Sequence, residues 1–206
     1  MNKQIAPNIS IKNICVYCGS GKGMNPNYAI AARQLGEIMG ESGIGLVYGG
    51  GGLGLMGEVA RSVLDHNGYV TGIIPKFLSD REQMLNDVQE LIVTKDMHER
   101  KMMMFKKSDA FVALPGGIGT LEELVEQLTW SQLGRHRKPI VILNIENFWE
   151  PLKKLLSHMR AELFIRENLD VSYHIVDKVG DVLPTIFEYY NHEASSENIG
   201  EVIAKF

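Results

Sequence analysis

The sequence has little cysteine, no long apolar run and no surplus of basic residues. Only Cys15 and Cys18 are cysteines among 206 residues, which excludes a disulfide framework. No apolar run approaches the roughly 18 residues of a membrane-spanning helix. Residues 1–12 lack the apolar centre and cleavage-like site of a signal peptide. We therefore expect a cytoplasmic protein with no membrane partner.

Cys15 and Cys18 form a C-x-x-C pattern, which in some proteins binds a metal or carries out redox chemistry. Here the pattern lies in an apolar run that is typical of a strand. Residues three apart on a strand point to opposite faces, so the two thiols are poorly placed to chelate a metal or to form a disulfide. We favour core cysteines in a reducing compartment over a functional pair, and we expect no metal site.

The charge balance restricts the class of partner. The formal net charge is −4 and the pI is near 5.9. Binding to a nucleic-acid polymer requires a basic face, so we expect no such partner. A small anionic ligand needs only local positive potential and stays possible. A hydrophobic content of 45% with 22% charged residues is typical of a globular protein, and the length suits one domain.

Short apolar runs alternate with helical patterns along the chain. Runs that are apolar throughout indicate strands buried on both faces, which favours an α/β fold with a doubly wound, Rossmann-like parallel sheet. Ligands of such folds bind beyond the carboxyl ends of the strands. The predicted strands are residues 14–17, 45–48, 69–74, 90–94, 110–114, 139–143 and 174–176. The predicted helices are residues 26–42, 56–66, 97–107, 120–133, 149–163 and 179–190.

We expect a single domain without internal repeats. Residues 1–12 are interpreted as an N-terminal extension, and residues 13–190 as a Rossmann-like nucleotide-binding catalytic domain. Residues 191–206 are a C-terminal tail to which the sequence assigns no structure.

The turn after the second predicted strand contains Gly52-Leu-Gly54-Leu-Met-Gly57, formally a dinucleotide-binding G-x-G-x-x-G. The fingerprint also needs an acid at the end of the next strand, and that strand ends in Pro75-Lys76 instead. We favour close packing of a helix on a strand, and keep an NAD-dependent oxidoreductase as a minor alternative. A P-loop is excluded because Gly23 follows Lys22.

The most informative run is Pro115-Gly116-Gly117-Ile118-Gly119-Thr120-Leu121-Glu122-Glu123. It predicts a glycine turn and a helix start, whose backbone N–H groups suit a phosphate. Thr120 can cap the helix and offer its hydroxyl to that phosphate. Two glutamates so close to an anion would repel it, so we expect them to take part in the reaction rather than to contact the phosphate. The competing interpretation is a capping box, in which Glu123 only bonds back to a backbone N–H.

A second group of residues begins the predicted helix 97–107. Arg100 and Lys101 oppose the helix dipole there, which is unfavourable unless an anion lies nearby. We interpret the run 102–105 as core or interface packing and His98 as structural. The basic run 135–138 follows the helix that ends near residue 133, and we interpret it as capping that helix.

Together these motifs resemble the LONELY GUY (LOG) family. Met97-x-x-Arg100-Lys101 followed by Pro115-Gly-Gly-x-Gly-Thr-x-x-Glu123 is similar to the paired signature of that family. The similarity extends from Cys15-Val-Tyr-Cys-Gly-Ser20 through Gly49-Gly-Gly to Trp130-x-Gln-Leu-Gly134. Relatives have often been labelled lysine decarboxylases, but no lysine here has a recognisable pyridoxal phosphate setting.

The resemblance implies a phosphoribohydrolase, which hydrolyses the N-glycosidic bond of a purine riboside 5′-monophosphate. By resemblance Glu123 and Arg100 are catalytic, Glu122 contacts the ribose, and Lys101 adds positive potential. The amides of Gly116, Gly117, Ile118, Gly119 and Thr120 hold the phosphate. The resemblance implies no cofactor and a homodimer. Adenine and an N6-modified adenine both stay open as the base. The alternative is a non-catalytic nucleotide or cofactor carrier on the same fold.

Overall fold

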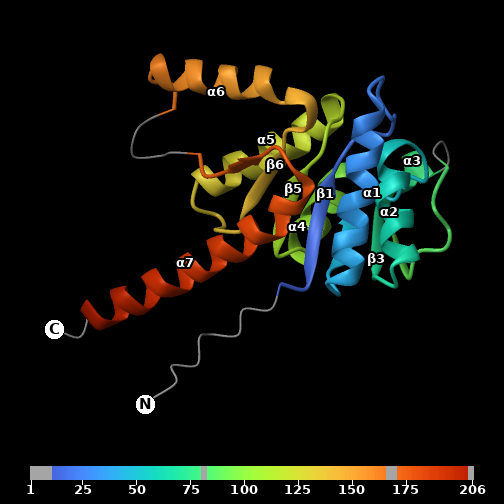
Figure 1. The fold of residues 1–206 in the computed structure, drawn as a ribbon, viewed down its shortest axis with the longest axis horizontal. Helices are drawn as coiled ribbons and strands as arrows, with labels where there is room; N and C mark the ends of the chain where they lie inside the picture. Colours follow the sequence, from blue (N-terminus) through green and yellow to red (C-terminus); the bar gives the residue numbers. More distant parts are fainter. Residues whose placement is uncertain (1–10, 80–82, 166–170, 204–206) are drawn as a thin grey trace.

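A seven-stranded, entirely parallel sheet forms the centre of the protein (Figure 1). The computed structural model describes residues 11–79, 83–165 and 171–203, without the side chains of 193–203. The strand order is β4-β3-β2-β1-β5-β6-β7. The strands are β1 (Asn13–Tyr17), β2 (Gly45–Tyr48), β3 (Val70–Pro75), β4 (Glu90–Thr94), β5 (Ala110–Ala113), β6 (Ile140–Leu143) and β7 (His174–Val176).

Helices cover both faces of this sheet, as the apolar strands predicted. The helices α1, α2 and α7 pack on one face and α4, α5 and α6 on the other. Their bounds are α1 (Pro26–Glu41), α2 (Gly54–Asp65), α3 (Lys76–Ser79), α4 (Met97–Lys107), α5 (Ile118–Gln132), α6 (Glu150–Ala161) and α7 (Val182–Ile203). The 3-10 turns are η1 (Ile145–Asn147) and η3 (Val179–Asp181).

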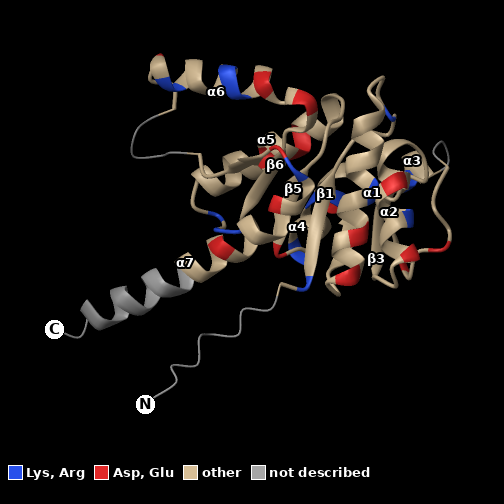
Figure 2. Cartoon of the chain, viewed as in Figure 1, with Lys and Arg blue, Asp and Glu red and all other residues tan. Residues whose placement is uncertain are grey.

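Alternate residues of the first strand enter the two halves of the core. Ile14 and Val16 belong to the cluster under α1 and α2, and Cys15 and Tyr17 belong to the cluster under α4 and α5. The strands β1, β2, β5 and β6 contain no charged residue, and Figure 2 draws the charges mainly on the helices around them. Burial on both faces explains why these strands read as continuous apolar runs.

The two cysteines lie as the strand geometry predicts. Cys15 faces the α4–α5 half of the core, whereas Cys18 faces the α1–α2 half. Both are buried and free, and burial raises the pKa of each thiol. Such thiols are poor nucleophiles, so the interpretation as core cysteines is confirmed.

Several helix boundaries differ from those expected. α2 begins at Gly54 and α5 at Ile118, two residues earlier than predicted in each case. A glycine-rich start hides a helix from propensity rules, because glycine is a poor helix former. The last helix, α7, continues to Ile203, beyond its predicted end at residue 190. The expected N-terminal extension lies mostly outside the described residues.

Candidate active site

The fold itself marks one place at the carboxyl edge of the sheet. β1 is hydrogen-bonded to both β2 and β5, so the chain order reverses between β1 and β5. Ligands of doubly wound folds bind at such a switch point. A hollow of about 250 Å³ lies between the loops that follow these two strands. Its lining is Gly19, Ser20, Gly21, Lys22, Gly23, Tyr28, Leu55, Pro115, Gly116, Gly117 and Phe148.

The first of these loops, 19–23, is the part of the site that the sequence interpretation missed. The sequence analysis gives the glycines of this loop no role in binding. The backbone of Gly19 donates to the carbonyl of Pro115 at 3.1 Å, which joins the loop to the turn after β5. The available signal was its position after the first strand of a doubly wound sheet, where phosphate-binding turns commonly occur.

The turn after β2 packs closely against the same loop. Gly54 begins α2 with φ +60°, and a Cβ at this position would overlap the backbone of Ser20. Close packing, the favoured interpretation of the G-x-G-x-x-G, is thus confirmed, but the partner of Gly54 is the loop after β1 rather than a strand. Leu55 of the same turn contributes to the wall of the hollow.

The N-terminus of α5 is open toward solvent. Its N-cap is Gly117, which has no side chain to bond the first N–H groups. Gly117, Ile118 and Gly119 are all exposed, and the side chain of Ile118 is 83% exposed. Unpaired backbone donors at a helix N-terminus are a ready anion site.

The capping-box interpretation of Thr120 and Glu123 is wrong. Thr120 lies inside the helix rather than at its cap, and it is buried beneath Gly116. A Cβ at Gly116 would overlap the Thr120 hydroxyl, so only glycine allows this close approach. The turn therefore depends on packing between Gly116 and Thr120.

Arg100 and Glu123 form a buried ion pair between α4 and α5. An Nη1 group of Arg100 donates to Oε1 of Glu123 at 2.6 Å, and the two side chains are only 9% and 10% exposed. Arg100 Nε also donates to the carbonyl of Ile73 at 3.0 Å, and its other terminal nitrogen packs against Gly49. The sequence analysis expects an anion near the cations at the start of α4. For Arg100 that anion is the carboxylate of Glu123, a partner that the sequence did not indicate.

This environment shifts the ionisation of Glu123. Burial raises the pKa of its carboxyl above the ordinary value, and the Arg100 guanidinium opposes that rise only in part. A buried carboxyl with a raised pKa next to a fixed cation is characteristic of catalytic sites. Helix α4 itself is capped by Asp96, whose carboxylate accepts from the N–H of Glu99 at 2.8 Å.

Lys101 and Glu122 form a second pair beside the first one. Lys101 Nζ lies 2.6 Å from Glu122 and 2.9 Å from Glu126, and the side chain of Glu122 is 52% exposed. Burial lowers the pKa of Lys101, but the hydrogen bonds that its Nζ donates to the two glutamates outweigh this effect, so the pKa is raised. Glu122 and Glu126 lie one turn apart and share a helix face, as expected.

The remaining candidate residues lie outside this site. His98 is exposed at the start of α4. Lys138 was expected to cap the helix before it, but its Nζ donates to the carbonyls of Phe105 and Ser108 at 2.7 Å each. Lys138 therefore satisfies the C-terminal end of α4 rather than α5, which corrects that interpretation.

Fold and site together define a class of protein. The class is a doubly wound α/β protein in which the N-terminus of α5 is open at the switch point and a buried Arg–Glu pair joins α5 to α4. A family model described as "Possible lysine decarboxylase" matches residues 56–186, more than half of the chain. The chain belongs to this family, the LOG family.

Curated relatives support the same assignment. The cytokinin riboside 5′-monophosphate phosphoribohydrolase LOG of Oryza sativa subsp. japonica is 49% identical over 157 residues, which cover 76% of this chain and 65% of the rice protein. The cytokinin riboside 5′-monophosphate phosphoribohydrolase LOG7 of Arabidopsis thaliana is 48% identical, and the match covers 75% of this chain and 71% of the Arabidopsis protein. A probable rice phosphoribohydrolase is 42% identical over 91% and 90% of the two chains.

Solved structures with the same fold carry other names. The Moco carrier protein of Chlamydomonas reinhardtii is 22% identical, with a TM-score of 0.67 over 88% of this chain and 98% of its own. A molybdenum cofactor binding protein of Rippkaea orientalis is 25% identical, with a TM-score of 0.64 over 87% and 98%. These likenesses establish the fold. Among the described residues, no helix combines the length and the apolar character that crossing a membrane requires.

Proposed function

We propose that the chain is a phosphoribohydrolase that cleaves the N-glycosidic bond of a purine riboside 5′-monophosphate. The products are the free base and ribose 5-phosphate. The observation that carries the proposal is the buried Arg100–Glu123 pair, whose glutamate lies on α5, the helix with the uncapped, glycine-rich N-terminus. The relatives named as cytokinin riboside 5′-monophosphate phosphoribohydrolases support it.

The 5′-phosphate binds the start of α5. The N–H groups of the exposed residues 117–119 and the positive end of the helix dipole stabilise the phosphate without a basic side chain. Five residues of helix separate Ile118 from Glu123, a rise of about 7.5 Å. That separation places a sugar, rather than the phosphate, beside the glutamate.

Glu123 acts on the sugar. Breaking the glycosidic bond develops oxocarbenium character, which a nearby carboxylate stabilises, and the same carboxylate can take a proton from the attacking water. A raised pKa makes Glu123 a stronger base than an ordinary surface glutamate. The reaction balances as water plus nucleotide giving base plus ribose 5-phosphate.

Arg100 holds Glu123 in place and balances its charge. Its guanidinium is itself fixed by the Ile73 carbonyl, so the carboxylate cannot rotate freely. By resemblance to the family, Arg100 also assists at the leaving base or at the sugar. Glu122, paired with Lys101 and half-exposed, is available to the ribose hydroxyls and is a binding residue rather than the base.

A substrate panel tests the proposal. AMP, isopentenyladenosine monophosphate and the corresponding ribosides without phosphate are incubated with the protein, and free base is measured by chromatography. We expect base release from monophosphates only, because the phosphate contact orients the sugar. Nucleotide binding without base release would establish the carrier alternative, and binding of NAD(H) with hydride transfer would establish an oxidoreductase. The relative rates of the two monophosphates decide between adenine and an N6-modified base.

The proposal includes a homodimer in the cytoplasm. Half-buried Phe105 of α4 packs edge-on against Trp130 of α5 at 5.2 Å, and Val125 of α5 is 41% exposed, so these helices present a shared apolar surface. The two free, buried thiols suit a reducing compartment. Light scattering should give twice the chain mass for the wild type. Val125→Glu should shift the mass toward the monomer, whereas Ile30→Glu on α1 should not.

A further inference from the structure

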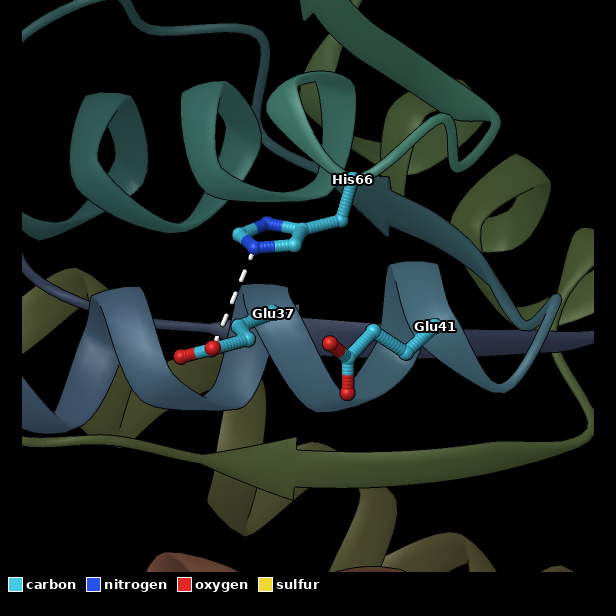
Figure 3. A group of neighbouring side chains, drawn as sticks. All are labelled: Glu37, Glu41 and His66. Carbon is cyan, nitrogen blue, oxygen red and sulfur yellow. Dashed lines mark ion pairs between the residues drawn. The ribbon is translucent and has the colours of Figure 1, made fainter.

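Three side chains with metal-ligand chemistry meet at the opposite end of the helices from the proposed active site. Glu37 and Glu41 lie one turn apart on α1, and His66 ends α2. One ligand atom from each lies within 4.8 Å of the other two. Figure 3 shows the imidazole reaching from α2 toward α1, with its Nε2 atom 3.8 Å from a carboxylate oxygen of Glu37.

Close packing of the two helices creates this arrangement. Gly40 lies on the face of α1 that meets α2, and a Cβ there would come within 2.7 Å of the His66 Cβ. Gly36, one turn earlier, faces Ser62 in the same way. Because no side chain separates the helices at these positions, His66 lies directly over the turn that carries both glutamates.

The imidazole is already oriented as in a metal site. Nδ1 of His66 lies 2.8 Å from the carbonyl oxygen of Ser62, which accepts only if Nδ1 carries the proton. In the neutral ring that bond leaves the lone pair on Nε2, the atom directed at Glu37. A backbone carbonyl that fixes the tautomer of a histidine is the usual outer support of a histidine ligand.

The two carboxylates are otherwise uncompensated. Like charges four residues apart on a helix destabilise it. Among the ion pairs of the described residues, none joins Glu37 or Glu41 to a lysine or an arginine. Glu58 on α2, by contrast, binds both Lys22 and Arg33. A cation at the cluster would remove the repulsion that the sequence leaves in place.

We propose that Glu37, Glu41 and His66 bind one Zn²⁺ ion that links α1 to α2. Zinc accepts one imidazole and two carboxylates with a water as the fourth ligand. Tetrahedral bonds of about 2.1 Å place the ligand atoms about 3.4 Å apart. The present separations are up to 4.8 Å, so rotation of exposed side chains closes the site without moving the backbone. The single nitrogen and two carboxylate oxygens also fit Mn²⁺ or Co²⁺, which compete in the test.

The site stabilises the fold rather than taking part in the reaction. α1 leaves the carboxyl edge after β1 and returns to the amino edge before β2, so Glu41 lies at the end remote from Arg100 and Glu123. An ion that binds only the folded chain raises its stability by mass action. Zinc should therefore raise Tm and leave the rate of base release unchanged.

Titration of the untagged, metal-free protein with ZnCl₂ against a chromophoric chelator tests the proposal. We expect one Zn²⁺ per chain, and Glu37→Gln, Glu41→Gln and His66→Asn should each weaken binding by about tenfold or more. The rise in Tm with zinc should disappear in the same variants. Co²⁺ should give the intense visible absorption of a tetrahedral complex, which His66→Asn should lose.

His158→Asn is the matched control, because His158 is an exposed histidine on α6, away from the cluster. This variant should bind zinc as the wild type does. Circular dichroism establishes whether each variant is folded. If His66→Asn does not fold, the conservative variant Glu41→Gln still provides the test. Equal zinc affinity in the wild type and the three variants, or no saturable binding, would overturn the proposal.

Discussion

Two ion pairs join the same two helices, one residue apart, in opposite environments. Arg100 and Glu123 are almost fully enclosed, whereas the neighbouring pair of Lys101 and Glu122 has a half-exposed carboxylate. The residue types and the distances are nearly alike, at 2.6 Å in each pair. The main difference between the two pairs is the burial of the carboxylate, and it changes the role of each pair.

Enclosing an ion pair is costly, because desolvation offsets most of the attraction. A protein could fill the same space with apolar side chains at no loss of stability. The retention of Arg100 and Glu123 in the core is therefore better explained by chemistry than by stability. The Lys101 pair is screened by water and contributes little to either.

The largest expected effect comes from leaving Glu123 unpaired. Arg100→Ala removes the partner of a buried carboxylate and should lower the free energy of unfolding by about 3–5 kcal/mol, with loss of turnover. Arg100→Lys keeps the charge but cannot bond Ile73 and Glu123 together, so turnover should fall further than stability. Urea denaturation and base release measure the two quantities. Unchanged stability in Arg100→Ala would mean that the pair is solvated.

Two glycines at the start of α5 should respond differently to substitution by alanine. Gly116→Ala forces a Cβ onto Thr120 and should cost about 1–3 kcal/mol of unfolding free energy and disturb phosphate binding. Gly119→Ala meets open space and should leave stability nearly unchanged. Thermal unfolding of the two variants is the comparison, and equal losses would contradict the packing of Gly116 on Thr120.

The raised pKa of Glu123 predicts opposite pH trends for stability and activity. A carboxyl whose pKa is higher in the folded state contributes stability that is fully present below its unfolded pKa of about 4.5 and is lost as pH rises through the folded pKa. Base catalysis needs the ionised form, so kcat should rise across the same interval. The unfolding free energy of the wild type relative to Glu123→Gln, followed with pH, isolates this group. A difference that does not fall as pH rises through that interval would contradict the raised pKa.

The smallest effect belongs to the exposed pair. Lys101→Met should change the free energy of unfolding by only about 0–1 kcal/mol, because both carboxylates that lose their partner, Glu122 and Glu126, have access to water. Urea denaturation beside Arg100→Ala gives the contrast. A loss as large as that of Arg100→Ala would remove the distinction between the two pairs.

The sequence indicated a parallel sheet covered by helices on both faces, but not which strands lie next to one another in that sheet. Continuous apolar strands predicted a parallel sheet because burial on both faces requires them. Nothing in the sequence of β5 indicates that it pairs with β1, which lies 96 residues earlier in the register of Val16 with Val112. That pairing positions the hollow, so its first loop was overlooked.

The candidate site, too, could be predicted only in part from the sequence. Glycine spacing located the turn at Gly116, because only backbone geometry is involved there. The pairing of Arg100 with Glu123 depends on how α4 and α5 pack, and that is a tertiary property. For the same reason, only the structure shows that Glu123→Ala would leave the buried Arg100 without its carboxylate. Burial of its partner now predicts lost stability, and Glu123→Gln, which can still accept from Arg100, is the cleaner variant.

The most direct test of the central claim measures base release from a purine riboside 5′-monophosphate by Glu123→Gln and Glu122→Gln side by side. We expect Glu123→Gln to lose about 100-fold or more in kcat while still binding the nucleotide. Glu122→Gln should mainly raise KM, as expected for a residue that only binds. Full turnover by Glu123→Gln, or the reverse order of the two variants, would contradict the assignment of the buried carboxylate as the catalytic group.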